Sequence, residues 1–207
     1  MLQLLPFRFW VKKSTFVLLS SVILLGSSAC EDEGTTAPVV QRTHQAYDLV
    51  SFLDQEAQAL MEKKATVRKT VSEAGKIRET KTFPSLNWTE ELAPFADADI
   101  NKPALTGLFN KETSSNAMGQ QVIRYKAKED ASTNVQEVTY TLDAKGQLVQ
   151  LDAVILQENM MFNTKKLLHL EAHSGPSPRV VRYHLDETQK LLFMGAERYS
   201  VTGEVIP

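Results

Sequence analysis

The chain has 207 residues, of which 23 are basic and 25 are acidic, and 43% of its residues are hydrophobic. A net charge of −2 leaves no basic footprint for binding nucleic acid or anionic lipid. Because Cys30 is the only cysteine, no intramolecular disulfide can form, and the fold must rest on its apolar core.

An apolar run from Thr15 to Gly26 follows the basic pair Lys12-Lys13 near the start of the chain. A helix that crosses a bilayer needs roughly 20 mostly apolar residues, so this run is too short to span one. A basic pair, a short apolar run and then small residues are typical of a secretory signal peptide. We therefore expect residues 1–29 to be a leader that is removed on export.

The residue at the expected cleavage point is Cys30, which follows Ser27-Ser28-Ala29. This arrangement resembles the lipobox of bacterial lipoproteins, in which the cysteine becomes the lipidated first residue, although Ser27 stands where Leu is usual. Glu31, Asp32 and Glu33 come next and resemble the export signal of surface lipoproteins in Bacteroidota. The resemblance implies a palmitate-bearing anchor at Cys30 in the outer membrane, facing the periplasm or the cell surface. The alternative is an ordinary cleaved leader with a free cysteine nearby.

The segment after Cys30 is polar up to about residue 42, and we expect residues 30–42 to be a flexible, acidic tether. A helix is predicted from Thr43 to Lys64, because apolar residues recur there every three or four positions. These residues are Tyr47, Val50, Leu53, Ala57, Leu60 and Met61. The acidic residues of this helix come before the basic pair Lys63-Lys64, an order that suits the helix dipole; they are Asp48, Asp54, Glu56 and Glu62.

The alternating segments Thr66–Val71 and Ile77–Lys81 predict a β-hairpin with charged outer faces. A second, short helix is predicted to begin after Asn87, whose side chain is a good N-terminal cap. Trp88, Leu92 and Phe95 then stand four and three positions apart and offer an aromatic-rich face to the core. We expect Trp88 to be a core anchor and not a platform for a ligand.

From Thr106 onward the pattern predicts strands joined by short turns. The predicted strands are Gln120–Ala127, Val135–Leu142, Gln147–Leu156, Met160–Ala172, Arg179–Leu185 and Lys190–Thr202. Consecutive strands with short turns form an antiparallel meander. The predicted fold is therefore a single α+β domain over residues 43–207, with the N-terminal helices packed on one face of a curved, mainly antiparallel sheet.

Three of the four histidines lie in or beside two of these strands, which are predicted to pair around Gly175. That pairing places Leu168, Leu170, Val181, Tyr183 and Leu185 on one face of the sheet. The opposite face then carries the best set of metal-ligating side chains in the chain: His169, Glu171, His173 and His184.

Positive charge on the same face opposes a metal ion, because Lys165 and Arg182 are predicted to lie beside these histidines. A cross-strand pair between Glu171 and Arg182 explains the residues without any metal. Zinc also needs supporting hydrogen bonds that the sequence does not identify. We therefore predict no metal site there, and the sequence alone leaves metal binding by these side chains open.

An aspartate-rich turn, Asp97 to Asn101, begins like a calcium-binding loop with oxygen ligands at alternating positions. The sixth position is Lys102 where glycine is needed, and the twelfth is Leu108 where a bidentate glutamate is needed. The segment is better interpreted as a solvated turn that ends at Pro103.

No catalytic signature is present in the sequence: it has no nucleophile elbow, no phosphate-cradling glycine loop and, with Cys30 lipidated, no free thiol. Ser174 follows His173, but adjacency in sequence is not the geometry of a catalytic triad. We therefore predict a protein that is not an enzyme and that has no cofactor.

Beyond the lipobox and the acidic spacer, four segments resemble small Bacteroidota lipoproteins that have no assigned activity. They are Tyr47–Leu53, Val67–Val71, Trp88–Leu92 and Asp99–Ala104. The resemblance implies a lipoprotein of this kind and brings no activity, ligand or partner with it. It marks Asp99–Ala104 as a feature whose role the sequence does not explain.

Two functions fit these observations. The first is a membrane-anchored lipoprotein whose non-catalytic domain binds a protein partner or serves as a scaffold. The second is a carrier of lipid or another apolar ligand, in which a half-barrel sheet holds the ligand. Methionine and leucine side chains suit a carrier but fill cores equally well; they are Met160, Met161, Phe162, Leu191, Leu192, Phe193 and Met194.

Overall fold

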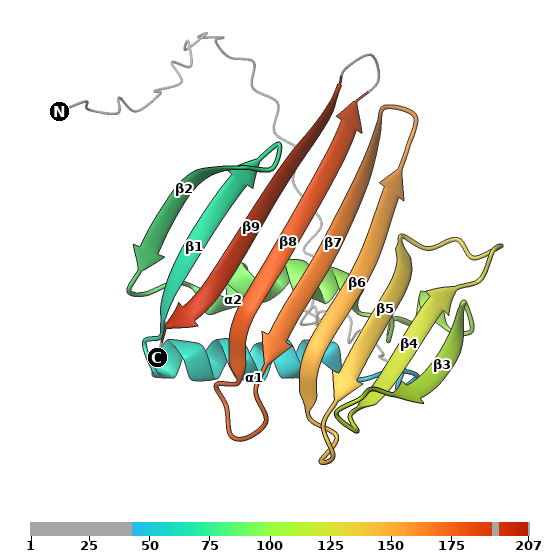
Figure 1. The fold of residues 1–207 in the computed structure, drawn as a ribbon. Coiled ribbons are helices and arrows are strands. Elements are labelled where there is room, and N and C mark those ends of the chain that lie inside the picture. The colour runs from blue at the N-terminus through green and yellow to red at the C-terminus, as the bar shows by residue number, and fades with distance from the viewer. Residues whose placement is uncertain (1–42, 192–194, 207) are drawn as a thin grey trace, which may run out of the picture. The chain divides into compact units, whose positions relative to one another are not determined.

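The computed structural model describes residues 43–191 and 195–206, which belong to one compact unit, residues 40–207 (Figure 1). Cys30, Glu31, Asp32 and Glu33 lie outside the described residues. The helical elements are α1 (Leu49–Glu62), α2 (Trp88–Leu92) and the 3₁₀ helices η1 (Ala93–Ala98) and η2 (Pro103–Leu105). The strands are β1 (Thr66–Glu73), β2 (Lys76–Phe83), β3 (Phe109–Ser115), β4 (Gln121–Ala127), β5 (Val135–Leu142), β6 (Leu148–Glu158), β7 (Phe162–Ala172), β8 (Val180–Leu191) and β9 (Ala196–Ile206).

All nine strands form one antiparallel sheet in the order β2-β1-β9-β8-β7-β6-β5-β4-β3. Strands β3 to β9 follow one another as a meander, in which each strand pairs with the next one along the chain. Some of the connections are tight turns. Between β5 and β6, for example, the Asp143 carboxylate accepts hydrogen bonds from the backbone N–H groups of Lys145 and Gln147, and Gly146 supplies a positive φ of 75°. The hairpin β1–β2 joins the meander because β1 pairs with β9.

The helical elements cover one side of this sheet, behind the strands in Figure 1. As the sequence predicts, Asn87 caps α2, and its side chain accepts a hydrogen bond from the Glu90 N–H. Trp88, Leu92 and Phe95 are each only 1% exposed, which confirms Trp88 as a core anchor. They pack with apolar side chains of α1 and of the sheet, including Leu60, Val138, Leu151 and Leu170.

Helix α1 begins at Leu49, six residues later than predicted, because the preceding segment is bound to a distant part of the chain. The Thr43 N–H donates to the Asn101 carbonyl at 2.8 Å, and the Ala46 N–H donates to the Asn101 side chain at 2.9 Å. Asp48 then caps the helix by accepting from the Ser51 N–H. The turn that contains Asn101 therefore fixes the entry into α1.

The α+β prediction agrees with the described fold, which is mostly β with few and small helices. Strand β3 was not predicted, because its mostly polar residues show no apolar alternation. Strand β9 begins later than predicted. Residues Thr188–Lys190 belong to β8, and β9 begins at Ala196. Pro94 ends α2 at Leu92, after which the chain continues as the 3₁₀ helix η1.

Candidate functional site

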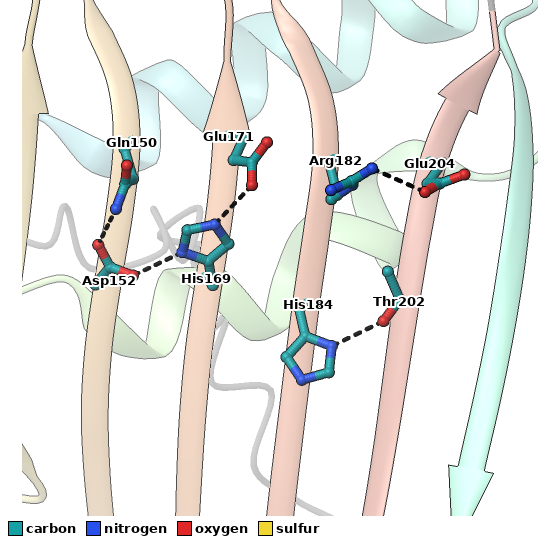
Figure 2. A network of polar contacts seen from close by, with 8 residues as sticks. All are labelled: Gln150, Asp152, His169, Glu171, Arg182, His184, Thr202 and Glu204. Carbon is teal, nitrogen blue, oxygen red and sulfur yellow. Dashed lines mark hydrogen bonds and ion pairs between the residues drawn. The ribbon is translucent and has the colours of Figure 1, made fainter. Parts of the chain in front are cut away.

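The side of the sheet opposite the helices, which we call the open face, is uncovered among the described residues and carries polar side chains. Strand register aligns two polar rows across β6, β7, β8 and β9 (Figure 2). One row is Asp152, His169, His184 and Thr202, and the other is Gln150, Glu171, Arg182 and Glu204. Alternation along each strand places these side chains opposite the buried core residues.

His169 lies between two carboxylates on the open face (Figure 2). Its Nδ1 is 2.6 Å from an oxygen of Asp152, and its Nε2 is 3.0 Å from an oxygen of Glu171. Ionised carboxylates only accept hydrogen bonds, so both contacts are satisfied together only when both ring nitrogens carry a proton. Partial burial lowers the pKa of His169, but the hydrogen bonds to Asp152 and Glu171 outweigh it, and the pKa is raised above its ordinary 6.5.

Several other charged groups of the open face are paired as well. Arg182 donates to Glu204 at 3.0 Å, and Arg68 of β1 donates to the same carboxylate. The hydrogen bond from Arg68 and its positive charge lower the pKa of Glu204. On the neighbouring row, Arg198 makes a bidentate contact with Asp186, with distances of 2.6 and 3.0 Å. The open face is therefore charged but largely neutralised within itself.

The expected division of side chains between the two faces is correct for β7 and for most of β8. His169, Glu171, Arg182 and His184 share the open face, and Leu168, Leu170, Tyr183 and Leu185 lie on the helix side. Val181 is the exception, since it is 40% exposed. A register shift pairs Ala172 with Val180 and Glu171 with Arg182, which leaves Val181 as an extra residue outside the ladder.

The observed side-chain contacts around the histidines differ from the predicted pair of Glu171 with Arg182. Glu171 and Arg182 are opposite each other, but Glu171 binds His169 and Arg182 binds Glu204. His184 Nδ1 contacts the Thr202 hydroxyl at 2.8 Å, and its Nε2 is 3.9 Å from Asp186. His173 is at the end of β7, where its Nδ1 contacts the Arg179 carbonyl. Within residues 43–191 and 195–206, no three His, Cys, Asp or Glu side chains are grouped as metal ligands.

This arrangement suits recognition better than chemistry. Both nitrogens of His169 are occupied by carboxylates, so the ring has no nitrogen left to act as a general base on a substrate. A small apolar patch, formed by Val154 and Leu167, lies next to the polar rows. It lines a shallow pocket of about 240 Å³ beside His169 and His184. An array of hydrogen-bond donors and acceptors with small apolar patches is suited to contact with another macromolecule.

A buried ion pair on the helix side was not predicted from the sequence, where Glu56 counted only among the acidic residues that suit the helix dipole. Glu56 is 0% exposed and accepts hydrogen bonds from the Ser177 hydroxyl at 2.6 Å, Arg179 Nε at 2.9 Å and the Val180 N–H at 3.1 Å. The Arg179 guanidinium also lies 4.9 Å from the centre of the Phe52 ring. The signal in the sequence was the position of Glu56, which is four residues after Phe52 and four before Leu60, within the apolar stripe of α1.

The segment Asp99–Ala104 has a structural role in the described chain. The prediction of a solvated turn is wrong for this segment, because Asp99 and Asn101 are buried. The Asn101 side chain donates to the Tyr47 carbonyl at 2.9 Å. The Asp99 carboxylate in turn accepts from the Asn101 N–H at 3.0 Å. These polar atoms hold the segment that precedes α1, so the role of Asp99–Ala104 in this chain is to fix that segment to the core.

Comparisons with family models, with curated proteins and with solved structures return no match to this chain. Among the described helices, none combines the length and the apolar character that a membrane span requires.

Proposed function

We propose that this chain is a lipoprotein, anchored in the outer membrane through acylated Cys30, whose open face binds a protein partner without catalysis. The proposal rests on one observation: a wide sheet has one face filled by helices, while the other presents ordered rows of polar side chains. Keeping such a face rigid and uncovered suits a binding scaffold.

The anchor is supported by the sequence Ser27-Ser28-Ala29-Cys30 and by the acidic residues that follow it. A diacylglycerol on the Cys30 sulfur and an acyl chain on its amine would meet the requirement for two membrane signals, at about 0.8 kcal/mol per buried methylene. Glu31, Asp32 and Glu33 would direct the protein to the cell surface.

The test of the anchor is the variant Cys30→Ser, followed by palmitate labelling and cell fractionation. We expect labelling to disappear and the protein to leave the membrane fraction. Unchanged labelling would show that Cys30 is not acylated. Neutral replacements at 31–33 should leave labelling intact and reduce cleavage of the protein by protease added to intact cells.

The test of the binding face is a photo-crosslinking amino acid placed at Thr139, which lies beside Asp152 on the open face. The matched control carries it at Gln58, on the exposed side of α1. We expect irradiation of intact cells to give a discrete crosslinked species from position 139 and none from position 58. The same species from both positions, or none from either, would contradict binding through the open face.

The alternative, a lipid carrier with a curved half-barrel sheet, has less support. Trp88, Leu92 and Phe95 occupy the space between helices and sheet that a ligand would need. Met160 and Met161, offered as cavity residues, are 93% and 72% exposed. Solvent extraction of purified protein should therefore release no non-covalently bound lipid, and a stoichiometric amount would favour the carrier.

A further inference from the structure

A second candidate binding site lies on the helix side of the sheet, away from the open face. It is a groove of about 700 Å³ between the segment η1–η2 and the ends of β5, β6 and β7. Small-molecule and peptide-sized sites commonly have volumes of 300 to about 1,000 Å³. Among the described residues, α1 and α2 do not extend over this end of the strands and leave the groove open.

Neutral hydrogen-bonding side chains dominate the lining. They come from the loop before β5, from β5 itself, and from β6 and β7: Ser132, Thr133, Asn134, Gln136, Gln157 and Thr164. Between them lie apolar side chains, of which Val135 and Ile155 are 4% and 6% exposed. The lining of the groove thus combines amide and hydroxyl groups with small apolar patches.

Two of the neutral side chains that line the groove, Thr164 and Gln136, are buried or half-buried. Thr164 is only 6% exposed, and no hydrogen bond among the described residues uses its hydroxyl. Gln136 sits at a register shift between Val135 and Glu137, and such bulges redirect a side chain out of the normal alternation. The Gln136 amide nitrogen donates to the Thr133 carbonyl at 2.9 Å, which fixes the side chain and leaves its oxygen available.

The charges at the groove balance. Lys166 and Asp97 form an ion pair at 3.3 Å, and Lys102 and Glu158 contribute one charge of each sign. An anionic or cationic ligand would therefore gain little here. A ligand matched to the lining is uncharged, carries regularly spaced amide donors and acceptors, and has small apolar groups.

We propose that this groove binds an extended, uncharged peptide segment of a partner protein. Side-chain amides such as those of Gln136 and Gln157 pair well with peptide bonds, and the floor at Val135 and Ile155 receives a small apolar side chain. A glycan is the less suitable occupant, because none of the described residues that line the groove is aromatic and could stack on a sugar ring. The site does not depend on the anchor or on the open face.

The test is selection of a random heptapeptide phage library on the full-length protein purified in detergent. We expect enriched peptides without charged residues. Their affinity should fall about tenfold for Thr164→Val, which removes one hydroxyl and keeps the shape, and for Gln136→Leu. The matched control, Thr113→Val in the exposed strand β3 and outside the groove, should bind as the original protein does.

Two outcomes would overturn the proposal. One is a library that yields no enriched peptide, or peptides that bind all three variants equally. The other is saturable binding of maltotriose that Thr164→Val abolishes, because the groove would then be a glycan site. Urea unfolding of each variant verifies that the folded state is retained during these measurements.

Discussion

The two faces of the sheet differ in how far their ion pairs are exposed to solvent. On the helix side, Glu56 and Arg179 are 0% and 9% exposed, and hydrogen bonds from the chain around Ser177 enclose the carboxylate. On the open face, Arg182 is half exposed and shares Glu204 with Arg68. The first pair is sealed in the core, whereas the second remains in contact with water.

This difference determines which face can change without loss of the fold. Exposed ion pairs contribute roughly 0–1 kcal/mol each, because water screens them and long side chains lose freedom in forming them. Removing one partner of a buried pair costs about 3–5 kcal/mol, because a charge is left without compensation. The helix side therefore carries the stability, and the open face is free to be shaped for binding.

The largest effect should come from Glu56→Gln. Gln has the same shape but no charge, so Arg179 is left buried without its counter-ion. We expect the free energy of unfolding, measured with urea, to fall by about 3–5 kcal/mol. Glu62→Gln, on the exposed side of the same helix, is the control and should change stability by about 0.5 kcal/mol or less.

The same carboxylate gives the helix side its pH dependence. Burial raises the pKa of Glu56, but hydrogen bonds from Ser177, Arg179 and Val180 outweigh it and hold the pKa below its ordinary 4.5. A depressed pKa in the folded state means that this stabilisation is present above pH 4.5 and is lost as the pH falls through the lower value. An equal loss of stability in acid for Glu56→Gln would contradict this assignment.

An intermediate effect is expected from Gly203→Ala in β9. A Cβ atom at this position would lie 2.0 Å from Cζ of Tyr183, whose hydroxyl donates to Glu91 at 2.5 Å. The ring cannot move aside without losing that hydrogen bond, so we expect a loss of about 1–3 kcal/mol in unfolding free energy. Gly195→Ala, which meets no atom within 4 Å, should be close to neutral. Equal effects of the two substitutions would show that Tyr183 is not held in place.

The smallest effect should come from His169→Gln on the open face. Because the pKa of His169 is raised in the folded state, its stabilisation is full below pH 6.5 and is lost as the pH rises through the folded value. The groups facing it are Asp152, Glu171 and His184. We expect the original protein to lose less than about 1 kcal/mol between pH 6 and pH 9, and the variant to lack this slope.

Nitrogen NMR of the imidazole provides the direct measurement for His169. A pKa above 6.5, with both ring nitrogens protonated below it, is expected from contacts to two carboxylates. A ring that titrates below 6.5 would show that the contacts to Asp152 and Glu171 do not persist in solution.

The sequence alone determined the features that depend on short-range pattern. Apolar spacing identified the core role of Trp88 and part of the buried stripe of α1, and the turn residues around Gly146 located the join of β5 and β6. The stripe was wrong at Met61, which is 41% exposed, and it omitted the buried Leu49 and Phe52. The two-residue period of β-strands was enough to place His169 and Glu171 on one face. The prediction of a lipid anchor likewise depends only on neighbouring residues, Cys30 and the acidic residues after it, and on no tertiary contact.

Only the tertiary structure decided which distant groups meet. A charged residue in an apolar stripe, such as Glu56, is interpretable only when Arg179, more than a hundred residues later, is known to cover it. The extra residue at Val181 and the pairing of β1 with β9 depend in the same way on neighbours across the sheet. Local pattern fixes which side of an element is apolar, but the partner of a buried charge is set by the packing of the whole domain.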